Sequence, residues 1–369
     1  MPGEIYAGVM SGTSLDGIDA VVAEFSATGG ACRTLGAAHL SMPAALRATL
    51  TDLQRAGNDE LARAARAEVD LADLYAEAVT QAMRAARCTP DRVNAVGVHG
   101  QTVRHRPADG WTIQLNDPSR VAERLNIPVV ADFRRRDIAA GGQGAPLVPA
   151  FHQAVFARGS LQRAVLNVGG IANLTLLARN GPVRGFDVGP GNVLLDAWHA
   201  RHRDGRFDVD GAYAAGGHVD GRLLALLLSE PYFEQRPPKS TGRDLFDAEW
   251  LDARLARYDG EPAPADVQAT LVELTAKTVG QALTREMPHC EELLVCGGGA
   301  RNATLMQRLW ATVAPMRLDT TQSEGVAVDQ VEALAFAWLA RQTLRGLAGN
   351  LPDVTGARGS RVLGAIYPK

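Results

Sequence analysis

The sequence lacks most features that mark metal-binding, secreted or membrane-spanning chains. Its 369 residues include four cysteines, and no two of them form a CxxC pair, which excludes a zinc knuckle and a thioredoxin-type motif. The segment Met1–Glu4 has no basic region followed by an apolar one, so no signal peptide is expected. The most apolar helical run, at 331–340, is too short to span a bilayer. We therefore expect a cytoplasmic protein without a membrane partner, whose cysteines are small buried hydrophobic residues in a reducing compartment.

A large net charge and two common phosphate-binding motifs are also missing. The formal net charge is only -3, so nothing in the overall field favours a nucleic-acid partner. Residues 239–241, Lys-Ser-Thr, lack the preceding glycines of a Walker motif, and no GxGxxG follows an expected strand. A P-loop and a dinucleotide-binding fold therefore have little support.

What the sequence does contain is three glycine turns, at 9–17, 166–173 and 294–302. In each, an apolar strand-like stretch breaks into glycine and small hydroxyl or amide residues. Glycine has no Cβ and tolerates positive φ, so such turns let backbone N–H groups approach an anion. Three of them in one chain predict a nucleotide held between two halves, and hence phosphoryl transfer.

The two halves of the chain repeat one order of elements: hairpin, helix, strand, glycine turn. Expected strands are 4–10, 18–25, 93–98, 164–168, 174–178, 292–296 and 361–367. Expected helices are 43–54, 60–87, 191–201, 266–286 and 302–313, and a loop is expected at 347–352. Such a weak duplication predicts two similar α/β lobes with mixed sheets and a cleft between them.

The expected domain boundaries follow from composition. We expect an N-terminal lobe at 1–131, joined by part of the C-terminal segment, and a C-terminal lobe at 132–346. Residues 347–369 would form a tail. The linker candidate is 132–149, which is rich in glycine, arginine and alanine.

A phosphate loop made by a hairpin tip and used twice is the arrangement of the actin, Hsp70 and sugar-kinase superfamily. Within it, the chain closely resembles the anhydro-N-acetylmuramic acid kinases. Seven motifs in the family's order carry this resemblance: 10–19, 99–102, 132–137 with 141–147, 167–173, 185–192, 239–244 and 297–302. The resemblance implies a two-lobed actin-like ATPase (ribonuclease H-like) fold with a central cleft, a homodimer, and ATP and Mg²⁺ as cofactors.

The family's activity, as the resemblance implies it, opens the 1,6-anhydro ring of 1,6-anhydro-N-acetylmuramic acid with water and phosphorylates O6. The product is N-acetylmuramic acid 6-phosphate, in peptidoglycan recycling. Asp187 lies between Phe186 and the turn 189–191, and in the family the aspartate at this position is the base that activates the water. The alternative is that Asp187 only caps the amides of residues 188–192.

The resemblance and the glycine turns together predict the nucleotide site. The expected ATP-binding residues are Gly12, Thr13, Ser14, Leu15, Asp16, Gly17, Ile18, Asp19, Gly169, Gly170, Asn173, Gly297, Gly298, Gly299 and Asn302. Asp16 and Asp19 are candidates to hold Mg²⁺ through water. The alternatives are an ordinary hairpin turn and a tight strand–helix connection, neither of which needs a ligand.

The sugar site is expected to include His99, Gln101, Asp187 and one arginine of 134–136. An arginine can bind the lactyl carboxylate with two parallel hydrogen bonds, and the family's pattern favours Arg136. The alternatives are a solvated basic edge and salt bridges between the lobes. Glu332, in an apolar helix, is expected near the reacting sugar as a second catalytic residue, or else is a charge at a helix N-terminus.

Two other functions fit the same residues less well. One is an actin-like kinase of a hydrated hexose or carboxylate, in which Asp187 would not activate water. The other is a non-enzymatic ATP-driven clamp or filament protein, which would need large insertions or a peptide-binding module for which this chain has no room.

Overall fold

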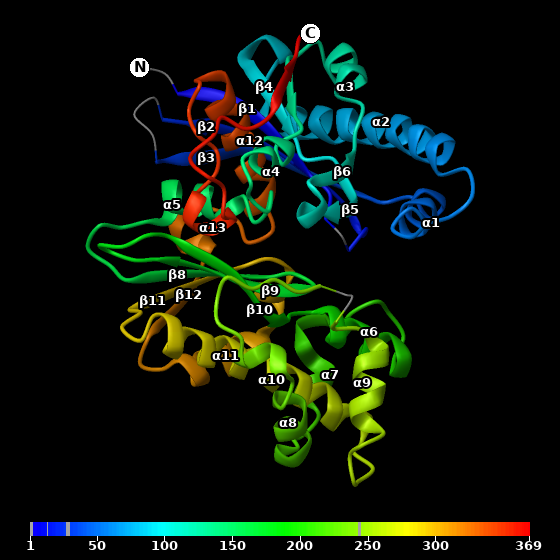
Figure 1. Ribbon diagram of the computed structural model, residues 1–369, viewed down its shortest axis with the longest axis vertical. Coiled ribbons are helices and arrows are strands. Elements are labelled where there is room, and N and C mark those ends of the chain that lie inside the picture. Colours follow the sequence, from blue (N-terminus) through cyan, green and yellow to red (C-terminus); the bar gives the residue numbers. More distant parts are fainter. Residues whose placement is uncertain (1–2, 13, 27–29, 243–244) are drawn as a thin grey trace. The chain divides into compact units, whose positions relative to one another are not determined.

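The computed structural model describes residues 3–12, 14–26, 30–242 and 245–369. The chain forms two compact units (Figure 1). The first unit contains residues 1–156 and 330–369, and the second contains residues 157–329. Each unit has its own sheet and its own hydrophobic core.

The first unit is built on a six-stranded mixed sheet in the order β13-β7-β4-β1-β2-β3. β1 pairs antiparallel with β2, so that Met10 lies opposite Asp19, and β4 and β7 continue parallel to β1. β5 and β6 form a separate hairpin. The strands are β1 (Glu4–Met10), β2 (Gly17–Phe25), β3 (Cys32–Ser41), β4 (Val93–Val98), β5 (Gln101–Arg106), β6 (Trp111–Leu115), β7 (Val129–Ala131) and β13 (Ala365–Tyr367).

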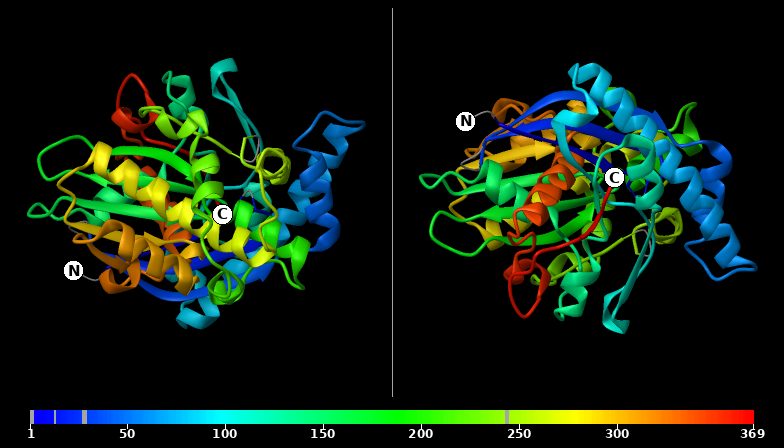
Figure 2. Two further views of the ribbon diagram at one scale, coloured as in Figure 1. Left: turned by 90° about the horizontal axis from the view of Figure 1, so that it is seen from below. Right: turned by 90° about the horizontal axis from the view of Figure 1, so that it is seen from above.

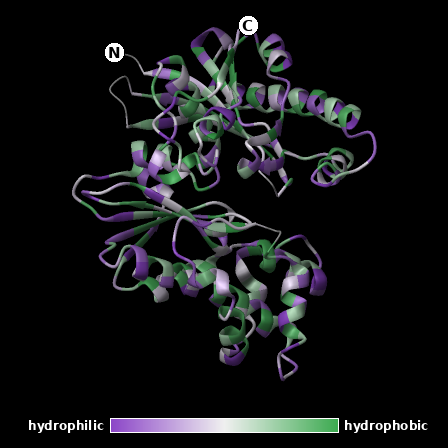
Figure 3. Ribbon diagram, viewed as in Figure 1, coloured by the Kyte–Doolittle hydropathy of each residue, from purple (hydrophilic) through white to green (hydrophobic). Residues whose placement is uncertain are grey.

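Two helices, α2 (Glu60–Ala86) and α12 (Val331–Leu344), cover opposite faces of this sheet. Ile5, Ala7 and Val9 of β1 share a core with α2, along which polar and apolar residues alternate (Figure 3). Gly8 faces the other way, where a Cβ would lie 2.0 Å from the carbonyl oxygen of Ala333 in α12. Glycine is therefore required there by the close approach of the helix backbone. The unit's shorter helices are α1 (Ala44–Asp52), α3 (Pro118–Leu125), α4 (Arg135–Ala139), α5 (Val148–Phe156) and α13 (Pro352–Thr355).

The second unit repeats this topology in its five-stranded sheet, ordered β10-β9-β8-β11-β12. β8 and β9 form the antiparallel hairpin, β10 pairs antiparallel with β9, and β11 and β12 run parallel to β8. The order and directions match β3-β2-β1-β4-β7 of the first unit, so the expected duplication and the mixed α/β sheets are confirmed. The strands are β8 (Arg163–Val168), β9 (Ile171–Leu177), β10 (Arg184–Pro190), β11 (Glu292–Cys296) and β12 (Arg317–Thr320).

The helices of the second unit pack on one face of its sheet, and α10 (Pro264–Glu286) lies along the strands (Figure 2). Leu166 and Val168 of β8 point into this core, so Asn167 between them points to the opposite face. Asn167 is paired in register with Asn173 of β9, and Asn173 with Asp187 of β10. The three polar side chains therefore share that opposite face. The other helices are α6 (Val193–His202), α7 (Ala212–Ala215), α8 (Gly221–Leu228), α9 (Ala248–Leu255) and α11 (Ala303–Val313).

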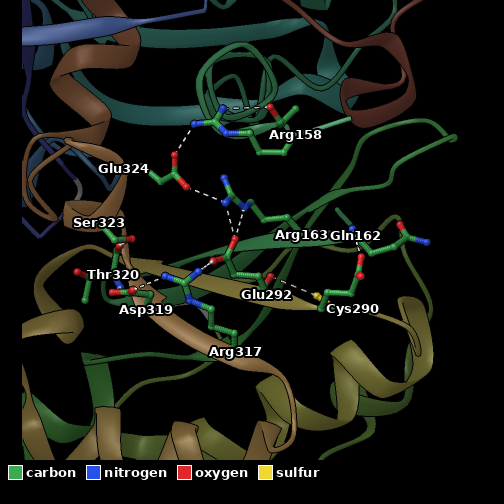
Figure 4. Close-up of polar contacts among 12 residues, drawn as sticks. Arg158, Gln162, Arg163, Cys290, Glu292, Arg317, Asp319, Thr320, Ser323 and Glu324 are labelled. Atoms are coloured by element: carbon green, nitrogen blue, oxygen red, sulfur yellow. Dashed lines mark hydrogen bonds and ion pairs between the residues drawn. The ribbon is translucent and has the colours of Figure 1, made fainter. Parts of the chain in front are cut away.

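A buried ionic network joins three neighbouring strands of the second sheet at their first residues (Figure 4). The guanidinium of Arg163, only 4% exposed, donates from Nε to Glu292 Oε2 at 2.6 Å and from Nη2 to Glu324 Oε1 at 2.7 Å. Arg317 of β12 lies 3.3 Å from the other oxygen of Glu292, and Arg158 pairs with Glu324. Each buried charge therefore has a partner, which its desolvation requires.

The segment 132–149, expected to be a linker, is instead part of the first unit. It contains α4, whose buried Asp137 accepts hydrogen bonds from Gly144 N–H (2.8 Å), Asn350 Nδ2 (2.7 Å) and Thr355 Oγ1 (2.7 Å). These contacts fix the segment against the C-terminal residues. The division between the units accordingly lies at 156/157 and 329/330 rather than after 131 and 346.

Several expected elements match the structure closely, but six strands were not among the expected ones: β3, β5, β6, β7, β10 and β12. Strands 4–10, 93–98 and 292–296 have the expected bounds, and β13 is shorter than expected. β3, an edge strand, was not anticipated from the sequence. All four cysteines are free, and three of them are buried. No helix among the described residues combines the length and hydrophobicity needed to cross a membrane.

Candidate functional site

The first glycine turn lies between β1 and β2 and is held from two sides. Leu15, at φ 55°, donates its N–H to the carbonyl of Gly12 at 3.2 Å. Arg47 Nε donates to the carbonyl of Leu15 at 2.8 Å, and Gln101 Nε2 donates to the carbonyl of Gly12 at 3.2 Å. The nearest neighbour of a Cβ added to Gly12 would be the Ser14 hydroxyl oxygen, at 3.6 Å. The backbone at Gly12 is therefore open to a ligand, as an anion cradle requires.

Other predicted nucleotide residues of this turn have packing roles. A Cβ on Gly17 would lie 2.7 Å from the carbonyl oxygen of Leu40 on the neighbouring strand β3, so glycine is needed there for β2 to pair with β3. Ile18 and Leu15 are buried in the core of the first unit. Thr13 lies outside the described residues.

Three carboxylates of the first unit influence one another. Asp16 is exposed and accepts from the Ser14 hydroxyl at 2.5 Å, and Asp19 lies 2.8 Å from His39 Nδ1. Glu332 is in the first turn of α12, where burial raises its pKa, with smaller contributions from Asp19 and Asp16. Among the described residues, no three metal-binding side chains are grouped closely enough to hold an ion by themselves.

His99 is a neutral hydrogen-bond acceptor in this unit. Arg134 donates to His99 Nε2 from Nε at 3.0 Å, and its Nη1 donates to the carbonyl of Gly144 at 2.7 Å. Because Nε2 accepts, the ring proton is on Nδ1. Burial, and next the charge of Arg134, hold the pKa of His99 well below its ordinary value, and burial lowers the pKa of Arg134 to about 10.

The two remaining sugar-site candidates of the first unit differ in their surroundings. Gln101 is fully buried and supports the glycine turn, and its Oε1 has no hydrogen-bond partner within the described ranges. Arg136 is exposed, and its guanidinium makes no hydrogen bond or ion pair with another described residue. Of the three consecutive arginines, Arg136 is therefore the one available to a ligand, because Arg134 is engaged and Arg135 pairs with Asp132 at 3.6 Å.

The second glycine turn, between β8 and β9, is bound to the start of α6. Asn192 N–H donates to the carbonyl of Gly169 at 2.8 Å, and Gly191 N–H donates to that of Gly170 at 2.9 Å. Added Cβ atoms on Gly169 and Gly170 would meet nothing closer than 3.7 Å and 3.9 Å. This turn, like that at Gly12, presents bare backbone.

The third turn, after β11, is mostly determined by packing. Gly297 has φ 80°, and its Cβ would lie 2.3 Å from Asn167 Oδ1, while that of Gly299 would lie 2.3 Å from a methyl of Val168. Gly298 alone is open, with its nearest neighbour at 3.8 Å. Asn302 Oδ1 caps α11 by accepting from the N–H of Leu305 at 2.9 Å.

Asp187 lies on β10 next to a bulge, and its carboxylate shares a sheet face with Asn173 and Asn167. Thr241 N–H donates to Oδ2 at 3.1 Å. Burial raises the pKa of Asp187 to about 6, against the smaller opposing effects of the Thr241 N–H and Lys239. The group is therefore ionised at neutral pH with a pKa close to that pH, as a general base needs.

Sequence reasoning missed the residues that hold this carboxylate. Tyr232 and Lys239 contact Asp187 from segments more than forty residues away in the chain. Residues 239–241 belong to one of the recognised motifs, but their local pattern gave no sign of the contact. The local sequence also gave no indication that Arg134 pairs with His99.

Comparison with known proteins agrees with these observations. Residues 4–369 match the family model described as anhydro-N-acetylmuramic acid kinase. Proteins of that name from Bordetella petrii, Thiobacillus denitrificans and Pseudomonas paraeruginosa are 56%, 54% and 52% identical to this chain. These matches cover 98–100% of this chain and 97–98% of the relatives. The chain is also similar, at a TM-score of 0.41 and 14% identity over 92% of its length and 99% of the other chain, to a ROK family glucokinase from Streptomyces griseus.

The family match spans both units and includes every motif that carried the resemblance. The chain therefore belongs to the anhydro-N-acetylmuramic acid kinase family.

Proposed function

We propose that the protein is an ATP-dependent kinase of 1,6-anhydro-N-acetylmuramic acid. It opens the 1,6-anhydro ring with water and phosphorylates O6, giving N-acetylmuramic acid 6-phosphate for peptidoglycan recycling. Family membership over the whole chain supports the kinase class, and no comparison supports a non-enzymatic clamp. The structural observation that carries the proposal is Asp187, a partly buried carboxylate with a pKa of about 6, of which one oxygen has no hydrogen-bond partner among the described residues.

In this mechanism Asp187 is the general base for ring opening. Oδ2 is held by the Thr241 N–H, and the carboxylate takes a proton from the water that attacks C1. The C1–O6 bond breaks as in glycoside cleavage, through a transition state with oxocarbenium character. The electron pair left on O6 forms the new bond to the γ-phosphorus, and ADP leaves. No separate acid is required, because the phosphoryl group captures the charge on O6.

The phosphates of ATP are assigned to the open backbone of the turns. Gly12, Gly169, Gly170 and Gly298 have the free space above the main chain that close approach of an anion requires. The packing roles of Gly17, Gly297 and Gly299 make them supports of these turns rather than contacts. When bound, Mg²⁺ would neutralise charge on the transferred group, and Asp16 and Asp19 are the residues that would hold it through water.

The sugar is assigned to His99, Gln101, Arg136 and Glu332. The free guanidinium of Arg136 suits the lactyl carboxylate. The buried, unpaired Oε1 of Gln101 is an acceptor that a sugar hydroxyl would satisfy. Glu332, whose pKa is raised by burial, is assigned to the sugar site by the family resemblance. We also propose that the protein is cytoplasmic. We further propose that it is a homodimer, and sedimentation of the purified protein would test this oligomeric state.

One isotope experiment tests the proposed reaction. The protein is incubated with ATP, Mg²⁺ and 1,6-anhydro-N-acetylmuramic acid in ¹⁸O water. The expected product is a 6-phosphate with the label at C1. ATP turnover that does not depend on the sugar would support a clamp instead, and an unlabelled phosphorylated product would mean that water does not open the ring.

A further inference from the structure

Asp187 is held at the edge of its sheet by two segments that have no assigned part in the reaction. β10 is an edge strand, so the outer N–H and C=O groups of Asp187 need partners other than a strand. The N–H donates to the carbonyl of Lys239 at 3.3 Å, and the carbonyl accepts from the Tyr232 hydroxyl at 2.8 Å. With Thr241 on Oδ2, only Oδ1 has no hydrogen-bond partner among the described residues.

The two segments are also tied to each other. Lys239 Nζ donates to the carbonyl of Tyr232 at 3.1 Å and lies 4.4 Å from the centre of its ring. Tyr232 belongs to the 3-10 helix η4 (Pro231–Glu234), and its side chain is buried edge-on against Phe246. Movement of Lys239 would therefore disturb both contacts to the backbone of Asp187.

The charges around Lys239 are mixed. Arg285 opposes its positive charge, while Glu286, Glu234 and Asp187 favour it. Burial is the largest effect and lowers the pKa of Lys239 to about 8, so the ammonium form prevails at neutral pH. Lys239 in turn lowers the pKa of Asp187.

We propose that Tyr232 and Lys239 are positioning residues for Asp187. The Tyr232 hydroxyl fixes the backbone of the base so that its free oxygen meets the attacking water, and the Lys239 charge stabilises the ionised carboxylate. This inference rests on the proposed function, because it assumes that Asp187 is the base.

The experiment measures kcat against pH for four variants. In Lys239→Gln an amide donor remains for the Tyr232 carbonyl but the positive charge is gone. The acid limb of the profile, which is the pH range over which kcat falls as the pH is lowered, should therefore shift to higher pH by roughly 0.5 to 1 pH unit. Lys239→Arg keeps the charge and should leave the limb in place. Tyr232→Phe should lower the plateau of kcat about tenfold, as loss of one hydrogen bond predicts, with KM and the limb unchanged. The kcat of Asp187→Asn shows whether Asp187 is the base.

Matched controls come from the same unit. Tyr258→Phe removes a hydroxyl that bonds Asp220, and Lys277→Met removes a charge that lies 3.7 Å from Glu273. Neither contacts Asp187, and neither should change kcat or the limb. The inference is overturned if Lys239→Gln leaves the limb in place or if Tyr232→Phe keeps full kcat while Asp187→Asn is inactive. An active Asp187→Asn enzyme would instead overturn the proposed base.

Discussion

Replacing Asp187 by asparagine should separate what this carboxylate does for catalysis from what it costs the fold. The side chains have the same shape, and the Thr241 N–H, 3.1 Å from Oδ2, can donate equally well to an amide oxygen. An amide cannot accept a proton from water. Loss of a general base lowers turnover by about 10²- to 10⁴-fold, and we expect kcat to fall in this range while ATP affinity changes less than threefold.

The same substitution should stabilise the protein at neutral pH. Burial raises the pKa of Asp187 from 3.8 to about 6, so the folded protein takes up a proton on Asp187 where the unfolded chain does not. Below pH 3.8 the group is neutral in both states and costs nothing. Between pH 3.8 and about 6 the unfolded chain ionises while the folded state disfavours the charge, so the free energy of unfolding falls with rising pH by at most about 3 kcal/mol in total and then stays level.

Asparagine never carries this charge. The stability of the variant relative to the wild type should therefore increase between about pH 4 and pH 6 and stay constant above that range. Urea unfolding of both proteins at a series of pH values measures the difference. A stability difference that does not change with pH would refute the raised pKa, and a variant with normal kcat would refute the assignment of the base. In the wild type, kcat should fall about tenfold per unit below pH 6 for the same reason.

Three further substitutions test other parts of the structure. Arg136→Ala should raise KM for the anhydro-muramic sugar by about 10- to 100-fold without changing KM for ATP, as loss of a charged hydrogen-bond partner predicts, and an equal effect on an uncharged glucosamine analogue would contradict this role. Arg163→Met should lower the free energy of unfolding of the second unit by about 3 kcal/mol, because among the described residues it leaves the buried Glu292 paired only with the exposed Arg317. The surface control Arg201→Met should cost under about 1 kcal/mol. Gly297→Ala should destabilise the protein by about 2 kcal/mol or more, since its Cβ would overlap Asn167. Gly298→Ala should keep normal stability and weaken ATP binding. If Gly298→Ala were the destabilised variant and Gly297→Ala the one with weakened ATP binding, the open backbone would be misassigned.

Local sequence patterns predicted the hairpins, the long helices and the duplicated α/β topology, because periodicity and turn chemistry act over short distances. They could not separate the glycines of the three turns by role. Gly12 and Gly17 are five residues apart in one motif, yet of the two only Gly17 is required by a neighbouring strand, through the carbonyl oxygen of Leu40. That difference depends on β3, an edge strand with half-exposed residues that the pattern did not reveal.

The expected linker failed for a related reason. Its glycine- and arginine-rich composition is typical of a loop, but Asp137 within it bonds to Asn350 and Thr355, more than 200 residues away. No window of local sequence contains both partners. A buried carboxylate with several donors converts a flexible-looking stretch into a fixed part of the first unit.

Asp137 and Asp187 together show how a structural carboxylate can be distinguished from a reactive one. Both are largely shielded from solvent, although Asp137 follows three arginines and Asp187 follows Gly185 and Phe186. Asp137 accepts from Gly144, Asn350 and Thr355, so both of its oxygens have hydrogen-bond partners. Asp187 accepts only from Thr241, and one oxygen has no partner among the described residues. A desolvated carboxylate with an unused oxygen gains free energy by binding a proton, which is what a base that activates water must do.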